Sequence, residues 1–345
     1  MAFVPTIVTF FSTSFFLLLL IPLAKRFNFL DQPGGHKTHS SSTPMIGGVG
    51  IYLGLVIAYI LSPALAEYFY PVLVLGGLIL LIGIIDDLAD LNPIHRLLAH
   101  ACVAFAMIES TGVKLENFGD ILFLGPIELG ILSVPMTVFA VVGVINAVNM
   151  SDGVDGLSSG LVVITLSFVA IANIFDGAGP LFYVTTLIAI SVLAFWLLNF
   201  RLIWNRKALI FLGDSGSNLL GFLVAWILIN ATNGESAFAA PVYALWFFAL
   251  PLMDTVSLLI RRPLLGRSPF KPGHDHLHHR LLEKGFTPKQ VILIIYSKAI
   301  AIGSVGLAGY LSGAPEGAMF FAFILLFILK WFESNALSKK IASKA

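Results

Sequence analysis

The sequence has little charge and almost no cysteine. Only 11% of its 345 residues are charged, and the mean hydropathy is +0.93, whereas soluble domains are about a quarter charged. This composition excludes an ordinary soluble domain and predicts a polytopic membrane protein. The single cysteine, Cys102, excludes an internal disulfide. We expect the lipid bilayer as a partner and no nucleic acid.

Features of processing and repetition are also missing. The first apolar segment has no basic residues before it and is followed at once by Lys25 and Arg26, unlike a cleavable signal peptide. No internal repeat, low-complexity region or interdomain linker is visible, so residues 1–345 are predicted to form a single domain. The absence of repeats disfavours many transporter folds, which are often built from them.

Long apolar runs are what the sequence has in abundance. A membrane helix needs about 20 mostly apolar residues, and eleven segments approach that length, of which the fourth and the eighth are short. The predicted fold is therefore an all-α polytopic membrane protein with about eleven transmembrane helices. The segments are 4–24, 46–64, 69–86, 97–111, 131–148, 157–175, 180–200, 217–231, 236–260, 291–311 and 315–332.

Basic residues are nearly absent from every second loop. If the segments alternate from an outside N-terminus, 17 of the 20 Lys and Arg fall in the inner loops or the C-terminal tail. Lys298 and Lys330 lie near inner helix ends, and only Lys114 is outside. The positive-inside rule then places the C-terminus in the cytoplasm. Because the inner loops also carry most polar residues, we expect the active site on the cytoplasmic loops.

The stretch NAVNMSDGVDGLSSG, residues 146–160, is a polar interruption between two uncharged segments. Its polar residues follow a spacing of three, which a regular helix would spread around its axis. The two glycines of the DGVDG run predict a sharp turn that brings some of these side chains together. The candidates are Asn146, Asn149, Asp152 and Asp155. The alternative is a glycine turn with solvated acids.

Four further acids lie at the ends of apolar segments or within one. Asp86 and Asp87 close an apolar segment, where adjacent acids oppose the helix dipole and need compensation by a cation or by Arg96. Asp214 opens a segment in GDSGS and is either a helix cap or a metal ligand. Asp254 lies within an apolar segment, either as a functional intramembrane acid or as a packing ion pair.

Two inner loops combine histidine with basic residues. DQPGGHKTHSSSTPMIGG, residues 31–48, offers Lys37, His39 and many small donors that suit a phosphate. The loop 261–290 contains HDHLHHR, which is either a zinc site or an anion cradle. Without cysteine and with many basic neighbours, the anion cradle is favoured, and a solvated basic loop is the remaining alternative. Its candidates are Arg262, His276, His278, His279 and Arg280.

Acidic and basic groups on one membrane surface suit a nucleotide diphosphate bound through Mg²⁺. Mg²⁺ prefers one or two carboxylates completed by substrate phosphates. Without a cation the acids would repel the anion that the basic loop attracts. The metal would neutralise charge that develops on the diphosphate.

Five motifs in this order resemble a known family. DQPGGHKTHSSSTPMIGG, GIIDDLADLNP, NAVNMSDGVDGL, IFLGDSGS and HDHLHHRLLEKGFT are similar to those of the polyprenyl-phosphate N-acetylhexosamine-1-phosphate transferases. The histidine loop resembles the bacterial undecaprenyl-phosphate GlcNAc-1-phosphate transferase type. The resemblance covers roughly residues 25–290.

The resemblance implies a reaction at the bacterial inner membrane. UDP-GlcNAc would give its sugar-1-phosphate to undecaprenyl phosphate, releasing UMP and starting a cell-surface polysaccharide such as O-antigen, lipopolysaccharide or cell-wall polymer. Mg²⁺, for which Mn²⁺ can substitute, would be the cofactor. Related sugars (FucNAc, GalNAc or MurNAc-peptide) stay open, as does a homodimer.

The resemblance also implies residue roles. Asp214 and Asn149 would hold the metal, and Asp86 or Asp87 would orient or deprotonate the lipid phosphate. Asp152 and Asp155 would lie near the metal and the uridine. The substrate contacts would be Lys37, His39, Asn146, Asn199 or Asn205, Arg262, His276, His278, His279 and Arg280.

The sequence departs from the family pattern in three places. His36 stands where an arginine is common, Gly273-His274 replaces Asp-Arg, and a short insertion before GDSG makes Asn199 and Asn205 compete for one asparagine. These departures bear on the sugar and base contacts. A lipid phosphatase, which would release inorganic phosphate, and a transporter coupled through Asp254 are the alternatives from other classes.

Overall fold

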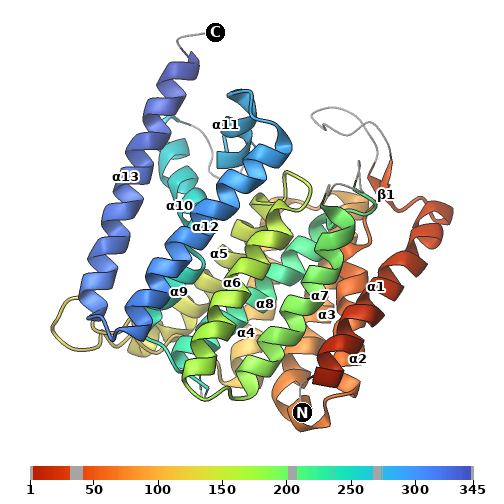
Figure 1. Ribbon diagram of the computed structural model, residues 1–345, viewed down its shortest axis with the longest axis horizontal. Helices are drawn as coiled ribbons and strands as arrows, with labels where there is room; N and C mark the ends of the chain where they lie inside the picture. The colour runs from red at the N-terminus through yellow and green to blue at the C-terminus, as the bar shows by residue number, and fades with distance from the viewer. Residues whose placement is uncertain are drawn as a thin grey trace.

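The computed structural model describes residues 3–31, 42–200, 208–234, 236–266, 273 and 275–342, with side chains described to Glu333. These parts form helices joined by short connections, two 3₁₀ turns (Pro63–Leu65 and Gly130–Leu132), and an antiparallel pair of two-residue strands, β1 (Leu30–Asp31) and β2 (Thr43–Pro44) (Figure 1). The helices are α1 (Phe3–Arg26), α2 (Gly47–Ile60), α3 (Ala66–Ala89), α4 (Pro93–Thr111), α5 (Ser133–Met150), α6 (Leu157–Phe175), α7 (Pro180–Asn199), α8 (Gly213–Asn233), α9 (Pro241–Phe247), α10 (Ala249–Leu264), α11 (Leu277–Glu283), α12 (Pro288–Leu311) and α13 (Glu316–Ala342). The all-α prediction is confirmed.

The long helices run up and down between two ends of the molecule. All eleven predicted segments correspond to helices, and the ninth, 236–260, corresponds to two, α9 and α10, which meet at an angle of 89°. Pro251 lies in the first turn of α10, where its missing N–H costs no helical hydrogen bond. α11 is an additional short helix in the histidine loop.

Fewer helices meet the criteria for a membrane span than the sequence predicts. Among the described residues, seven helices are long and apolar enough to cross a bilayer, or eight if α9 and α10 form one broken span. The predicted number of about eleven exceeds this count, in part because α2 has only 14 residues. The chain is a multi-pass membrane protein on either count.

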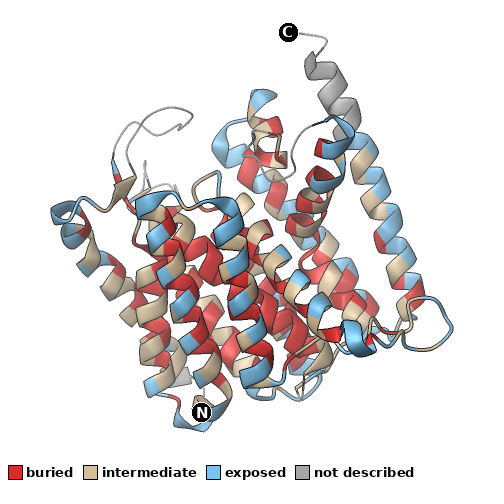
Figure 2. Ribbon diagram, turned by 180° about the vertical axis from the view of Figure 1, so that it is seen from behind, coloured by how far each residue is buried: buried red, intermediate tan, exposed pale blue. Residues whose placement is uncertain are grey.

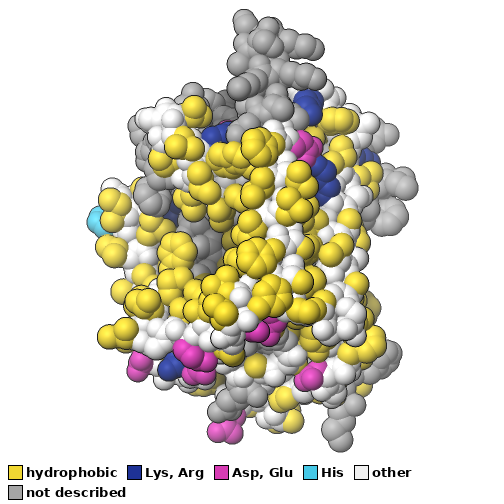
Figure 3. Space-filling model, turned by 90° about the vertical axis from the view of Figure 1, so that its left-hand side faces the viewer, with side chains coloured by type: hydrophobic (Ala, Val, Ile, Leu, Met, Phe, Trp, Pro, Cys, Tyr) yellow, Lys and Arg dark blue, Asp and Glu magenta, His cyan; other side chains and the backbone are white. Residues whose placement is uncertain are grey.

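Charge is distributed between the two ends as the loops predicted. On the face shown in Figure 3, apolar side chains cover the middle, Lys and Arg lie mainly toward the α11 end, and most acidic side chains lie at the opposite end. This grouping agrees with the basic and acidic loops of the sequence. The placement of the basic end in the cytoplasm stays a prediction.

Helix α8 lies at the centre of the bundle. Its membrane-length apolar stretch is wholly buried. Figure 2 shows buried residues gathered in the middle of the molecule with exposed ones around them. Glycines let neighbouring backbones approach it: a Cβ on Gly48 of α2 would lie 2.6 Å from Gly216 Cα, and one on Gly221 would lie 2.5 Å from Ile145 Cα of α5. Close packing thereby fixes the N-terminus of α8 against α2, α3 and α5.

Candidate active site

Asp87 binds the first turn of α8. Its two carboxylate oxygens accept hydrogen bonds from the backbone N–H groups of Asp214 (2.8 Å) and Ser215 (3.1 Å). The first N–H groups of a helix have no partner within the helix, so a carboxylate there is stabilising. Gly83, one turn before Asp87, permits the approach because a Cβ there would lie only 2.7 Å from the Ser215 nitrogen. Asp87 therefore fixes the position of the helix start that carries Asp214.

The two predicted metal ligands lie in direct contact. The Asn149 amide nitrogen donates to Asp214 Oδ1 (2.6 Å) and to Ser217 Oγ (2.9 Å). Both bonds use the amide nitrogen of Asn149, so its amide oxygen remains as the atom that could bind a metal. The Asp214 side chain is 41% exposed, so it faces an accessible site. The two residues to which the resemblance gives the metal are thus hydrogen-bonded to each other, and their binding of a metal stays a prediction.

Asp86 has partners within the protein. Its carboxylate forms an ion pair with Arg96 (2.7 Å) and accepts a hydrogen bond from the Leu91 backbone N–H (2.9 Å). Arg96 also reaches to 3.9 Å from Asp214 Oδ2. The compensation that the paired acids required is thus an arginine for Asp86 and backbone N–H groups for Asp87. Both acids therefore have partners within the protein. Their predicted role toward the lipid phosphate stays a prediction.

Arg96 was not among the predicted site residues. It is four positions into α4, after a Pro at the first helical position, and its guanidinium lies between Asp86 and Asp214. The sequence did offer Arg96 as a partner of the paired acids, and its ion pair with Asp86 confirms that alternative. Its approach to Asp214, more than 100 positions away, could not be read from its place in the sequence.

The turn between α5 and α6 carries two acids, Asp152 and Asp155, beside the Asn149–Asp214 pair. Asp152 is exposed, yet enclosure by protein and then the negative charges of Asp214, Asp155 and Asp87 raise its pKa to about 8. These four carboxylates repel one another, and a bound cation would relieve that repulsion. The charges of the predicted residues therefore fit a cation at this position.

The donor set is suited to Mg²⁺ shared with a substrate. Within the described ranges, no three His, Cys, Asp or Glu side chains form a complete metal site. Mg²⁺ commonly takes one or two protein carboxylates and completes its shell with water and phosphate oxygens, and Asp214 with Asn149 would be donors of that type. A closed protein zinc site of four ligands, the alternative for the histidine loop, is not formed by the residues described.

Asp254 anchors the histidine segment. Its Oδ2 lies 3.0 Å from His276 Nδ1, and its Oδ1 accepts from the Leu277 backbone N–H (3.2 Å) at the start of α11. Arg280 Nη2 lies 3.9 Å from the same carboxylate. Of the two interpretations left open for Asp254, these contacts favour a packing ion pair over a coupling site.

A second acid holds the chain that leads into α11. Asp275 forms ion pairs with Arg262 (2.6 Å) and Arg261 (3.0 Å) at the end of α10. Hydrogen bonds from these two guanidinium groups outweigh the effect of burial and hold the pKa of Asp275 below its usual range. Arg262 is 4% exposed, so the structure places it as a support of the histidine segment.

The histidine helix, α11, is in contact with the acid turn, which is the connection 151–156 between α5 and α6. A Cβ on Gly153 would lie 2.9 Å from His278 Cε1, so glycine at this position lets the imidazole approach the turn. The His278 ring lies between those of His276 and His279, with centroid distances of 5.8 and 4.1 Å. His276, His278 and Arg280 are all buried. Two motifs more than 120 positions apart, one acidic and one mainly basic, therefore lie in contact.

The remaining predicted residues divide into three groups. The Asn146 side chain donates to the Val142 carbonyl of its own helix (2.7 Å) and makes none of the contacts that join Asn149 to Asp214. Asn199 is buried, accepts from the Gly156 N–H and donates to the Ile210 carbonyl (2.8 Å), so its amide holds backbone. Lys37, His39 and Asn205 lie outside the described residues.

The sequence is similar to those of known proteins over most of its length. The model of Glycosyl transferase family 4 matches residues 69–232, which include Asp87, Asn149 and Asp214. The undecaprenyl-phosphate alpha-N-acetylglucosaminyl 1-phosphate transferase of Escherichia coli O157:H7 is 34% identical over 325 residues, covering 93% of this chain and 87% of that protein.

Proteins of the same name from two other bacteria are equally similar. The one from Yersinia pestis is 34% identical over 91% of this chain and 86% of its own length, and the one from Haemophilus influenzae is 34% identical over 93% and 91%. The resemblance in the motifs is thereby confirmed over nearly the whole sequence. The chain belongs to glycosyl transferase family 4, and it is a membrane enzyme of the sugar-1-phosphate transferase type.

Proposed function

We propose that this protein transfers N-acetylglucosamine-1-phosphate from UDP-GlcNAc to undecaprenyl phosphate, with release of UMP. The observation that carries the proposal is the meeting of the Asn149–Asp214 pair, the acid turn and the histidine helix at one end of an apolar bundle. The names of the relatives support the two substrates. We place the reaction at the cytoplasmic face of a bacterial inner membrane, as the first step of a cell-surface polysaccharide.

Asp214 and Asn149 would hold Mg²⁺, which when bound neutralises charge on the diphosphate of the UDP-sugar. The basic side chains opposite them would bind phosphate oxygens. Arg96 lies 3.9 Å from Asp214, and Arg280 stands on the histidine helix. A guanidinium gives several donors in fixed directions and suits phosphate recognition.

The lipid phosphate needs little help to become a nucleophile. The second pKa of a phosphate monoester is about 6, so it is largely ionised at neutral pH. This agrees with the contacts of Asp86 and Asp87, whose oxygens are engaged by Arg96 and by backbone N–H groups. We therefore propose that these two acids position the site and that Asp152 and Asp155 are the acids nearer to the reacting groups.

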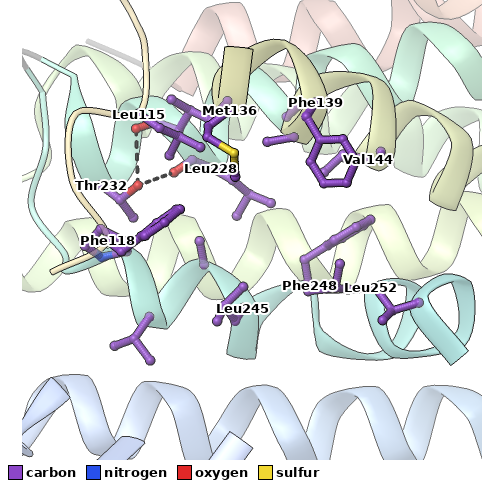
Figure 4. Close-up of a pocket in the computed structure, with 18 of the residues that line it drawn as sticks. Leu115, Phe118, Met136, Phe139, Val144, Leu228, Thr232, Leu245, Phe248 and Leu252 are labelled. Atoms are coloured by element: carbon purple, nitrogen blue, oxygen red, sulfur yellow. Dashed lines mark hydrogen bonds between the residues drawn. The ribbon is translucent and has the colours of Figure 1, made fainter. Parts of the chain in front are cut away.

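An apolar cavity offers room for the polyprenyl chain. It has a volume of about 480 Å³ and lies between α5, α8, α9 and α10, where the 89° bend separates the last two. Figure 4 shows Phe139 and Val144 of α5 facing Phe248 and Leu252 across it. Val144 is five residues before Asn149, or roughly 7.5 Å along a helix. A lipid in the cavity would bring its phosphate near the metal-binding pair.

The proposal predicts a specific product. Purified protein incubated with undecaprenyl phosphate, Mg²⁺ and labelled UDP-GlcNAc should give UMP and a labelled lipid in equal amounts, one of each per transfer. The nucleotide product is UMP because the sugar keeps its phosphate. UDP-GalNAc, UDP-FucNAc and UDP-MurNAc-pentapeptide serve as parallel substrates. Labelled lipid from none of these donors would refute the transferase, and inorganic phosphate from the lipid alone would indicate a phosphatase.

Loss of Asp254 should weaken binding of the UDP-sugar. Asp254→Ala removes the anchor of His276 and of the α11 N-terminus, so the histidine helix loses its fixed position. We expect KM for UDP-GlcNAc to rise about tenfold, with a smaller change in kcat. Initial rates at varied UDP-GlcNAc measure this.

Asp176→Ala is the matched control, because Asp176 is exposed at the opposite end of the bundle, after α6. Its KM should equal that of the unchanged protein. If Asp254→Ala also keeps an unchanged KM and kcat, the histidine helix does not contribute to binding in the way proposed.

A further inference from the structure

The acid turn ends at a glycine whose two flanking peptide groups are held by side chains of other helices. Gly156 follows Asp155 directly and has a φ of +88°, which L-residues with a side chain rarely adopt. Its N–H donates to Asn199 of α7 (2.5 Å), and its carbonyl accepts from the hydroxyl of Tyr296 of α12. A glycine can rotate easily, so these two bonds set the direction of the chain.

The partners of the Tyr296 hydroxyl determine the direction of its hydrogen bonds. The Trp196 indole N–H lies 2.9 Å from the same oxygen, and an indole nitrogen can only donate. The hydroxyl therefore accepts from Trp196 and donates to the Gly156 carbonyl. Trp196 is itself fixed by stacking on Phe200, with ring centroids 4.8 Å apart.

Two glycines leave the space that the tyrosine and its neighbour Phe200 occupy. A Cβ on Gly160 would overlap the Tyr296 oxygen, and one on Gly156 would lie 2.7 Å from Phe200 Cδ2. Tyr296 is one turn beyond Ile292, which packs with Leu281 of α11 in a small separate apolar cluster. The tyrosine thus connects the helix pair that carries the histidines to the turn that carries the acids.

We propose that Tyr296, supported by Trp196, is a positioning residue for the sugar-1-phosphate transfer. It holds the Gly156 carbonyl so that Asp152 and Asp155 keep their places beside Asp214. The effect on rate rests on the proposed function, whereas the effect on the turn does not. The Tyr296 hydroxyl donates to a backbone carbonyl of the turn, so its influence on the two acids passes through the backbone.

The test compares Tyr296→Phe with Tyr310→Phe on the same helix. Tyr310 lies near the other end of α12 and contacts Phe238 and Tyr243 through its ring, which phenylalanine keeps. For Tyr296→Phe we expect faster hydrogen exchange of the amides in 151–157, by about tenfold or more. We also expect kcat to fall about 10- to 100-fold, as small misplacements in active sites do, with KM for UDP-GlcNAc within about threefold. Tyr310→Phe should leave both properties unchanged.

Two results would overturn the proposal, each at a different step. Unchanged exchange in 151–157 would show that the hydroxyl does not hold the turn, whether or not the protein is a transferase. Faster exchange with kcat unchanged would show that the turn does not control the rate. Should Tyr296→Phe not fold, Trp196→Phe keeps the tyrosine and removes the indole N–H together with part of the ring, and a smaller change of the same kind, about two- to tenfold, is expected there.

Discussion

Replacing Asp214 by asparagine is expected to lower kcat at least about 10³-fold. The carboxylate accepts from Asn149 at 2.6 Å, is partly exposed and interacts electrostatically with Asp86 and Arg96. Its charge also acts on Asp152 in the neighbouring turn. Asparagine has nearly the same shape but no charge, so a Mg²⁺ held as we propose would lose the charge of its carboxylate ligand. Losses of this size are typical when charge stabilisation of a transferring phosphoryl group is removed. Single-turnover rates at saturating substrates measure the effect.

Two controls separate chemistry from folding in this experiment. Ser217→Ala removes the other acceptor of Asn149 (2.9 Å) and leaves Asp214 intact, so we expect a loss of about tenfold or less. Asp176→Asn, at the opposite end of the bundle, should be neutral. The thermal stability of Asp214→Asn should remain close to that of the unchanged protein. A kcat within tenfold of normal for Asp214→Asn would contradict the site assignment.

Asp87→Asn is expected to lower kcat by about 10²- to 10³-fold through a displaced helix start. The aspartate accepts from two backbone N–H groups, those of Asp214 and Ser215. Asparagine keeps one acceptor but turns an N–H₂ donor toward the second N–H, and that unpaired contact costs about 1–3 kcal/mol. Because Asp214 is the first residue affected, the rate should fall while both KM values change little.

The matched control for Asp87 is Asp90→Asn at the end of the same helix. Asp90 is exposed and has a φ of +49°, a conformation that asparagine tolerates well, so its rate should stay within about twofold. Asp87→Glu should not restore the rate, because the longer side chain cannot meet both N–H groups across the Gly83 contact. Full activity in Asp87→Asn would show that α8 keeps its start without this carboxylate.

Much of the fold followed from local pattern. The apolar runs predicted where the helices lie, and all eleven segments overlap helices. The runs did not give the correct number of membrane-spanning helices. That number depends on where each helix begins and ends in the structure, and seven or eight helices among the described residues are long and apolar enough. The break at Phe248 was also not predicted. A helix break depends on the direction in which the chain packs, and the residues of 236–260 are apolar on both sides of it.

The candidate site was predictable where polar residues cluster in apolar surroundings. Unpaired polar groups near a bilayer are costly, so Asn149, Asp152 and Asp214 had to have partners or ligands. Their roles were less predictable. Asp86 and Asp87 looked equivalent in the sequence, yet one pairs with an arginine and the other with backbone N–H groups, which a list of side chains does not reveal.

The sequence by itself determined the all-α membrane architecture, the division of charge between two ends and the set of acids and histidines from which the site is proposed. These depend on composition, period and local spacing, which act along the chain. Only the tertiary structure decided that Asp87 holds α8, that Asp254 holds His276, and that Tyr296 and Asn199 hold Gly156. Each of these contacts joins segments that are distant in sequence. Their partners are chosen by the close approach that particular glycines permit and by the need to satisfy buried polar groups.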